Sequence, residues 1–241
     1  MKTVLITGGT KGIGKAVAQE FLTQGYEVIL NYFHDEEAAL SAQSEFNMQG
    51  FCPVLMRADV SDEEQVRDMF KEVFRIYGRV DVLVNNAGIS KVQVIQDTTL
   101  YDWEEVFGVN ARGTFLCSRE VAENMIYSGG GCIINIASIW GEVGASCEVA
   151  YSASKGAVIA FTKALAKELA PSFVRVNCVS PGVIDTEMNS HLSEVEMEDL
   201  INQIPLQRMG TGEDVAKACL FLAENTYITG EVLSVGGGFA K

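Results

Sequence analysis

Basic residues, histidines and prolines are scarce in this 241-residue chain. Eighteen lysines and arginines against 32 acids give a formal net charge of −14, which argues against a nucleic-acid partner because nucleic acids are bound by clustered cations. Two histidines, and six scattered cysteines without a Cys-x-x-Cys pair, cannot supply the spacing of a zinc site, so no metal is expected. With four prolines and no low-complexity run, the composition is that of an ordinary globular protein.

Long apolar runs are also missing. No stretch of 18 apolar residues is present, so the sequence predicts no membrane-spanning helix. The N-terminus enters a predicted strand within a few residues and lacks the charged and apolar regions of a signal peptide. Scattered cysteines are typical of free thiols in a reducing compartment. We therefore expect a cytoplasmic protein.

Short apolar, β-branched runs alternate with longer amphipathic segments along the whole chain. This alternation predicts a parallel sheet joined by right-handed crossovers, with helices on both faces: a doubly wound α/β fold. Strands are expected at Thr3–Thr7, Glu27–Tyr32, Cys52–Ala58, Val82–Asn85, Cys132–Ala137, Val174–Ser180 and Val232–Val235. Helices are expected at Gly12–Gln24, Asp35–Met48, Asp62–Tyr77, Leu100–Tyr127, Val149–Ala170 and Asp214–Ala223. The acidic segment Asp185–Gln207 interrupts the alternation and is expected to form a substrate lid.

The first predicted strand runs into a glycine-rich turn, Thr7-Gly8-Gly9-Thr10-Lys11-Gly12-Ile13-Gly14, that opens a helix. Glycines allow the backbone to approach a pyrophosphate closely, and a helix N-terminus supplies N–H donors. The spacing Gly9-x4-Gly14-Lys15 approaches a nucleotide-binding P-loop. Ala16 replaces the Ser or Thr that would bind Mg²⁺, so an NTPase is discounted. The turn instead predicts a dinucleotide site.

The end of the second predicted strand bears on which dinucleotide binds. It reads Asn31-Tyr32, without the acidic residue that would hydrogen-bond a free ribose 2′-hydroxyl. Asp35 comes later, where it is expected to cap the next helix. Because Lys11 offers a cation nearby, we predict a preference for NADP(H) over NAD(H).

Candidate ligand contacts also follow the third and fourth predicted strands. Asp59 and Val60 follow the third, and Asn86, Ala87 and Gly88 follow the fourth. Carboxyl ends of parallel strands form the ligand edge of such a sheet. Asp59 is expected to meet the adenine, and the stretch from Asn86 to line the cofactor.

Tyr151 and Lys155 are four residues apart in a predicted helix, so both side chains lie on one face. A neighbouring cation favours the phenolate, and it is expected to lower the pKa of Tyr151 toward that of a useful proton donor. Ser138 precedes Tyr151 by thirteen residues, at the end of a predicted strand. The three side chains are candidates for one catalytic site.

Four motifs in this order resemble the short-chain dehydrogenase/reductase family. They are Thr7-Gly-x-x-x-Gly-x-Gly14, Asn85-Asn-Ala-Gly88, Ser138 and Tyr151-x-x-x-Lys155, with Asn110, Pro181-Gly182 and Thr186 completing the pattern. The resemblance covers essentially the whole chain. It implies a single Rossmann domain, residues 1–241, with seven parallel strands, a nicotinamide cofactor and a homotetramer. A cofactor-binding part would occupy about 1–137, and a catalytic and lid part about 138–241.

The resemblance also implies roles for individual residues. Tyr151 would donate a proton to a carbonyl oxygen that Ser138 holds, Lys155 would lower the Tyr151 pKa and bind the nicotinamide ribose, and Asn110 would fix a proton-relaying water. The expected cofactor contacts are Gly8, Thr10, Lys11, Gly12, Ile13, Gly14, Asn31, Tyr32, Asp59, Val60, Asn86, Ala87, Gly88, Tyr151, Lys155, Pro181, Gly182, Val183, Ile184 and Thr186. The expected substrate contacts are Ser138, Trp140, Val143, Tyr151 and Met188.

The C-terminal motifs are similar to those of 3-oxoacyl-acyl-carrier-protein reductases. They are Ile204-Pro-Leu-Gln-Arg-Met-Gly210, Glu213-Asp-Val-Ala216 and Tyr227-Ile-Thr-Gly-Glu231. This similarity implies a 3-oxoacyl thioester substrate and a role in fatty acid biosynthesis. Relatives that reduce small ketones, sugars or steroids share these motifs, so that alternative stays open. A dinucleotide sensor without catalysis is the alternative from another class, although a sensor would be expected to lose Tyr151 or Lys155.

Charge argues against docking of an acidic acyl carrier protein. The stretches 124–131 and 170–174 carry no basic residue, and the net charge of −14 repels an acidic partner. Arg112, Arg119 and Lys91 are candidates for a local basic patch that could still dock one.

Overall fold

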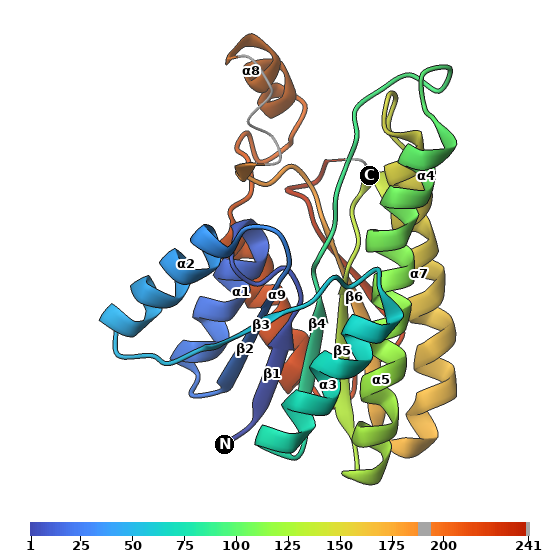
Figure 1. The fold of residues 1–241 in the computed structure, drawn as a ribbon. Helices are drawn as coiled ribbons and strands as arrows, with labels where there is room; N and C mark the ends of the chain where they lie inside the picture. Colours follow the sequence, from blue (N-terminus) through green and yellow to red (C-terminus); the bar gives the residue numbers. More distant parts are fainter. Residues whose placement is uncertain (188–193, 240–241) are drawn as a thin grey trace.

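Seven parallel strands form one sheet at the centre of the molecule, as the sequence predicts. The structure is a computed structural model that describes residues 1–187 and 194–239. The strands are β1 Thr3–Ile6, β2 Glu27–Tyr32, β3 Val54–Arg57, β4 Val82–Asn85, β5 Gly131–Ile136, β6 Val174–Pro181 and β7 Val232–Val235. Their order across the sheet is β3-β2-β1-β4-β5-β6-β7. The doubly wound, single-domain Rossmann fold is confirmed (Figure 1).

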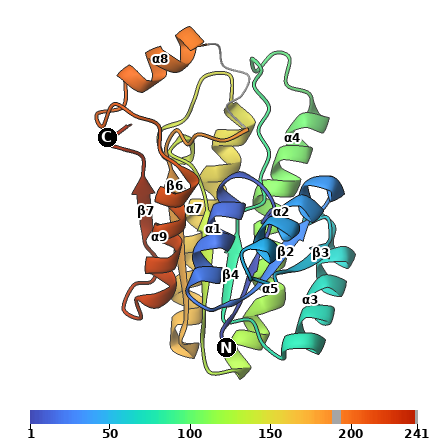
Figure 2. The same ribbon diagram turned by 90° about the vertical axis from the view of Figure 1, so that its left-hand side faces the viewer.

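Helices cover both faces of this sheet (Figures 1 and 2). The helical segments are α1 Gly12–Thr23, α2 Glu36–Met48, α3 Glu63–Tyr77, α4 Leu100–Phe107, η1 Gly108–Arg112, α5 Gly113–Tyr127, α6 Trp140–Val143, α7 Val149–Leu169, η2 Ala170–Ser172, α8 Glu194–Asn202 and α9 Gly212–Glu224. Side chains of α1, α2 and α9 pack on one face, and those of α3, α5 and α7 on the other. Strand β1 supplies both cores, because Val4 and Ile6 face the first and Leu5 the second.

Capping side chains fix several helix starts where the sequence places them. Asp62 accepts hydrogen bonds from the backbone N–H groups of Glu64 and Gln65 at the start of α3. Thr99 and Thr211 each form a reciprocal capping box, at α4 and α9. Asp35 caps α2 by accepting from the backbone N–H of Ala38, as expected.

The structure departs from the predicted elements at four places. The predicted helix Leu100–Tyr127 contains a π-helical turn, η1, between α4 and α5. The predicted strand Cys52–Ala58 shrinks to Val54–Arg57, since Pro53 has no N–H to donate to the sheet. Helices α6 and α8 were not predicted, because a four-residue turn and an acidic lid segment carry little periodic signal.

Strands β1 and β4 are neighbours, although β2 and β3 separate them in sequence. The strand order reverses between them, and ligands bind beyond the carboxyl ends of strands at such a switch point. The glycine turn after β1 and the segment Asn85–Gly88 after β4 therefore lie side by side. Helix α8 lies beyond this same end of the sheet (Figure 1). Among the described helices, none has the length and apolar character needed to cross a membrane.

Candidate active site

Tyr151 and Lys155 lie one turn apart on α7, and both are buried, with 9% and 4% of their surface exposed. Ser138 follows β5 by two residues and is 7% exposed. Its hydroxyl is hydrogen-bonded to the Tyr151 side chain and accepts the backbone N–H of Trp140 at 3.2 Å. The three predicted catalytic side chains thus meet at the carboxyl end of β5.

Close packing of α6 on α7 makes this meeting possible. A Cβ added to Gly141 of α6 would lie 2.7 Å from the carbonyl carbon of Lys155. Any side chain at position 141 would force α6 away from α7. Glycine there keeps the segment after Ser138 against the helix that carries Tyr151.

Burial shifts the pKa of both side chains, Tyr151 and Lys155. It raises the pKa of Tyr151 to about 12, with the Ser138 hydrogen bond opposing the rise and the charge of Glu148 adding to it. Burial lowers the pKa of Lys155 to about 8. Its Nζ donates to the carbonyl of Ile136 at 2.8 Å and lies 5.7 Å from the centre of the Tyr151 ring.

The pKa of Tyr151 therefore moves opposite to the direction expected from Lys155. The sequence locates the cation on the same helix face. It does not reveal that the phenol is nearly enclosed, and desolvation of the phenolate outweighs other influences here.

Asn110 lies in the π-helical turn η1 and is 1% exposed. Its Oδ1 accepts the backbone N–H of Ile89 at 2.9 Å, and its Nδ2 donates to the carbonyl of Ile89 at 2.9 Å. Nδ2 also donates to the hydroxyl of Ser154 at 2.9 Å, and that hydroxyl donates to the carbonyl of Tyr151 at 2.7 Å. Asn110 thereby ties η1 to the β4 loop and to α7. Single π turns inside α-helices are frequent at functional sites.

Ser154 was missed by the sequence reasoning, although it lies three residues after Tyr151 on α7. That spacing is the signal that could have found it, because a serine hydroxyl reaches the carbonyl one turn earlier. Gly88 completes the cluster. A Cβ added there would lie 3.2 Å from the Lys155 Nζ and 3.3 Å from the Asn110 Oδ1. The β4 loop, η1 and α7 therefore converge on one point.

The glycine turn after β1 is tightly closed. Gly8 and Gly12 have φ of +59° and +48°, and a Cβ on Gly14 would lie 2.2 Å from the carbonyl oxygen of Gly8. Asn86 braces the turn, since its Nδ2 donates to the carbonyls of Thr7 and Gly8 at 3.0 and 2.9 Å. Thr10 is buried and Ile13 packs on the core.

The start of α1 has no side-chain cap. Its N-cap residue, Lys11, makes no side-chain cap, so the first backbone N–H groups of α1 have no capping side chain. A closed glycine turn at an uncapped helix N-terminus fits the pyrophosphate of a dinucleotide.

The other predicted cofactor contacts surround this turn. Asn31 is 2% exposed; its Oδ1 accepts from the Gly8 N–H at 3.4 Å and its Nδ2 donates to the Ala58 carbonyl at 2.9 Å, so its side chain positions the turn. Tyr32 is half-buried at the end of β2. The Asp59 Oδ1 accepts from the hydroxyl and the N–H of Ser61, both at 2.8 Å. Val60 is 7% exposed and lies against Gly113. The backbone N–H of Ala87, like that of Asn86, donates a hydrogen bond to the Thr7 hydroxyl.

The segment after β6 lies against both the Ser138 turn and the glycine turn. The Pro181 carbonyl accepts from the Ile139 N–H at 3.0 Å, which joins this segment to the Ser138 turn. Gly182 approaches Gly236 so closely that an added Cβ would lie 2.6 Å from its Cα. Val183 and Ile184 are 8% and 4% exposed. Thr186 lies beside the glycine turn, because a Cβ on Gly12 would be 3.5 Å from its Cγ2.

The predicted substrate contacts differ in their surroundings. The Trp140 ring packs edge to face on Phe239, with ring centres 5.5 Å apart, and is half-buried. Val143 is 56% exposed. Met188 lies outside the described residues. Ser90 and Glu148 are two further polar residues that border the site and were not predicted. The Ser90 hydroxyl donates to the Glu148 carboxylate at 2.5 Å.

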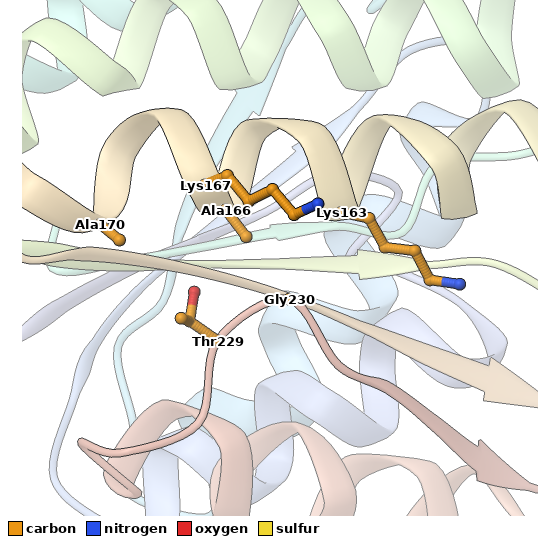
Figure 3. Close-up of a pocket in the computed structure, with 6 residues that line it drawn as sticks. All are labelled: Lys163, Ala166, Lys167, Ala170, Thr229 and Gly230. Atoms are coloured by element: carbon orange, nitrogen blue, oxygen red, sulfur yellow. The ribbon is translucent and has the colours of Figure 1, made fainter.

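A cavity of about 380 Å³ lies elsewhere, between α7 and the turn before β7 (Figure 3). Its lining residues are Lys163, Ala166, Lys167, Ala170, Thr229 and Gly230. Lys163 is twelve residues beyond Tyr151, roughly 18 Å along the helix axis at 1.5 Å per residue. This cavity is separate from the catalytic cluster, so we do not assign the reaction to it.

The three cations left for a basic patch are already engaged. Lys91 pairs with Asp102 at 2.6 Å and Glu105 at 2.5 Å, and Arg119 pairs with Glu63 at 2.8 Å and Glu120 at 3.0 Å. The Arg112 guanidinium donates to the Ser61 carbonyl at 3.1 Å. Acids neutralise the charges of Lys91 and Arg119, which weakens the basis for such a patch.

Known proteins resemble this chain over nearly its full length. A family model described as enoyl-(acyl carrier protein) reductase matches residues 8–240. The 3-oxoacyl-[acyl-carrier-protein] reductase FabG of Aquifex aeolicus is 41% identical over 239 residues, covering 98% of this chain and 96% of that protein. FabG of Staphylococcus aureus strain Mu50 is 37% identical, with 98% and 97% covered. The uncharacterized oxidoreductase YmfI of Bacillus subtilis is 36% identical over 241 residues, with 99% and 98% covered.

Proposed function

The chain belongs to the short-chain dehydrogenase/reductase family and is an oxidoreductase acting on C–OH and C=O groups, and from this premise we propose that it is an NADP(H)-dependent carbonyl reductase. The reaction would interconvert a ketone and a secondary alcohol. The observation that carries the proposal is the buried cluster of Ser138, Tyr151, Lys155 and Asn110 beside the glycine turn. When bound, the nicotinamide supplies the hydride or accepts it.

Each residue of the cluster has a part in moving a proton. The Tyr151 phenol donates its proton to the carbonyl oxygen, and its raised pKa keeps it protonated at neutral pH. Ser138, hydrogen-bonded to that phenol, holds the same oxygen. The ammonium of Lys155 favours the phenolate that forms, and Asn110 fixes the water that returns a proton to Lys155. Positioned acid catalysis of this type typically contributes about 10²–10⁴-fold in rate.

The preference for NADP(H) is part of the proposal. Its support is the absence of an acid at the end of β2 and the position of Lys11 at the start of α1. Lys11 also forms an ion pair with Asp35, which a 2′-phosphate would have to replace. Both side chains are exposed, and surface pairs of this kind contribute little stability.

For the substrate we propose 3-oxoacyl thioesters first, because the FabG relatives are named for the 3-oxoacyl reaction. A small ketone, sugar or steroid is the second candidate, and the pairing of Lys91 and Arg119 with acids favours it over a carrier-bound substrate. A dinucleotide sensor without catalysis is the alternative from another class. The intact cluster around Tyr151 argues against the sensor.

Three expectations about the molecule in its setting also stay proposals. They are a homotetramer, a cytoplasmic location, and a division into a cofactor part at about 1–137 and a catalytic part at about 138–241. Asn110 and Gly88 belong to the first part in sequence, yet they contact the catalytic cluster. The two parts would therefore share the site.

Tyr151→Phe tests the proposed function. We expect turnover of every reducible ketone to fall by about 10²–10⁴-fold because the proton donor is lost. Binding of NADPH, followed by fluorescence, should change little. Turnover is measured as NADPH oxidation at 340 nm with a panel of ketones and acyl thioesters.

Tyr127→Phe is the matched control, since Tyr127 is 82% exposed on α5. Near-normal turnover by Tyr151→Phe would refute the catalytic assignment. A wild-type protein that binds NADPH but reduces nothing across a broad panel would instead support the sensor.

A further inference from the structure

The hydroxyl of Ser154 joins the π-helical turn η1 to the helix that carries Tyr151. Ser154 is fully buried, and it lies on α7 one residue before Lys155. Its Oγ accepts a hydrogen bond from the Asn110 Nδ2 at 2.9 Å and donates one to the Tyr151 carbonyl at 2.7 Å. One hydroxyl therefore contacts both a side chain of η1 and the backbone of the proposed proton donor.

Helix formation does not account for this hydroxyl. Tyr151 lies inside α7, where α-helical geometry pairs its carbonyl with the backbone N–H four residues later. A serine that bonds back to an earlier carbonyl slightly destabilises a helix, and alanine is the better helix former. What serine adds at this buried position is an acceptor for the amide of Asn110.

Hydrogen bonds from several segments hold Asn110. Its Oδ1 and Nδ2 bond the backbone of Ile89 in the β4 loop, both at 2.9 Å. Its carbonyl accepts from the Thr114 hydroxyl of α5 at 2.7 Å. The second Nδ2 proton goes to Ser154, and this is the bond that reaches α7. Ser154 thus fixes the Asn110 amide relative to the helix that carries the catalytic pair.

The amide that Ser154 holds borders the space around the Lys155 ammonium. A Cβ added to Gly88 would lie 3.3 Å from the Asn110 Oδ1 and 3.2 Å from the Lys155 Nζ. Both atoms therefore face the same backbone position of the β4 loop. A displaced Asn110 amide would change the surroundings of Lys155.

We propose that Ser154 is a positioning residue for the proton relay, holding the Asn110 amide where Asn110 serves Lys155. The inference rests on the proposed carbonyl reduction and adds a residue to its machinery. Ser154 acts through Asn110 and transfers no proton itself. Because its loss displaces Asn110 without removing it, the effect falls on turnover and is smaller than that of losing the Tyr151 phenol.

Ser154→Ala tests the proposal in the full-length protein, with the substrate of the panel that the wild type reduces fastest. We expect kcat to fall about tenfold, since a misplaced relay slows each turnover. The KM of that substrate and the dissociation constant of NADPH, measured by fluorescence, should change by less than about twofold.

Asn124→Ala is the control for lost stability. The Asn124 side chain bonds the Gly78 carbonyl at 3.0 Å and the Val80 N–H at 3.2 Å, at the end of α5 away from η1. Its removal breaks two hydrogen bonds outside the catalytic cluster, so kcat should stay close to that of the wild type. Urea denaturation compares the stability of the two variants.

A double-mutant cycle shows whether Ser154 acts through Asn110. In an Asn110→Ala background, Ser154→Ala should lower kcat by less than about a further twofold, because the amide that Ser154 holds is gone. An independent role would lower kcat by the same factor of about ten in both backgrounds.

Hydrogen exchange gives a readout that needs no turnover. Ser154→Ala should speed exchange of the backbone amides of η1, because the tie to α7 is lost, and Asn124→Ala should not. If Ser154→Ala does not fold, Ser154→Cys carries the test, since a thiol has a similar shape and is a weaker acceptor.

The outcomes separate this inference from the proposed function. Unchanged kcat in Ser154→Ala, an equal loss in Asn124→Ala, or a full tenfold loss in the Asn110→Ala background would overturn this inference alone. A wild type that reduces no ketone or thioester would overturn the proposed function and this inference with it.

Discussion

Lys11 illustrates how one side chain can serve the fold and a ligand in turn. Its ammonium is hydrogen-bonded to Asp35 and lies 3.6 Å from Glu187, and the Asp35 hydrogen bond is the main reason that the Lys11 pKa is raised. Asp35 also caps α2. Asp35, which the sequence predicts to cap a helix, thus also binds Lys11, which the sequence predicts to contact the cofactor.

We predict that Lys11→Ala weakens binding of NADPH about tenfold and that of NADH by less than twofold, because only NADPH carries the phosphate that would replace Asp35. Asp35→Asn should have the opposite effect and strengthen NADPH binding. Dissociation constants are measured by fluorescence titration, with no turnover required. Lys15→Ala, which removes a cation paired with Glu45, is the control. An equal loss for both cofactors would show that Lys11 does not read the phosphate.

At the scale of elements, a buried chain of polar side chains joins the sheet to the helices of one face. The Asn85 Nδ2 of β4 donates to the Asn135 Oδ1 of β5 at 2.8 Å and to the Ser118 hydroxyl of α5 at 3.0 Å. The Asn135 Nδ2 donates to the Thr162 hydroxyl of α7 at 2.8 Å. The network holds α7, which carries Tyr151, against β5, which ends just before Ser138.

Asn135→Ala should lower the free energy of unfolding by about 2–3 kcal/mol, since Asn85 and Thr162 would each lose one buried hydrogen bond. Urea denaturation followed by circular dichroism measures the loss. Asn47→Ala on the exposed end of α2 should change stability by less than about 0.5 kcal/mol. A loss as small in Asn135→Ala would mean that the network contributes no net stability.

For the whole molecule, the sign and distribution of charge matter most. The net charge is −14, and Lys91 and Arg119 are each paired with acids. An acidic carrier protein would be repelled at long range and would have to displace these partners. The charge therefore favours substrates that arrive without an acidic protein.

We predict that kcat/KM for a 3-oxoacyl group on a carrier protein is no higher than for the same group on a truncated pantetheine thioester. Raising the ionic strength from about 0.05 to 0.5 M should raise the carrier-linked rate, because salt screens the repulsion. NADPH oxidation with both thioesters side by side measures the ratio. A strong preference for the carrier-linked form, reduced by salt, would reverse the electrostatic argument.

Most of the fold could be predicted because its signals are local. Alternating apolar strands and amphipathic helices, with the capping residue Asp35, predict the element order and most boundaries within a few residues. The π turn at Asn110 and the short helix α6 could not be predicted. Their geometry depends on contacts with Ile89 and Lys155, which lie far away in the sequence.

The sequence by itself determined the reaction class, since the spacing of Tyr151 and Lys155 on one helix, with Ser138 before them, follows from helical geometry and motif order. Only the tertiary structure decided how those groups behave. Burial raises the Tyr151 pKa although Lys155 is near. The ammonium of Lys11 donates a hydrogen bond to Asp35, and the hydroxyl of Ser90 donates one to Glu148. Each outcome depends on desolvation or on a contact between distant segments, and neither can be predicted from the local pattern of residues.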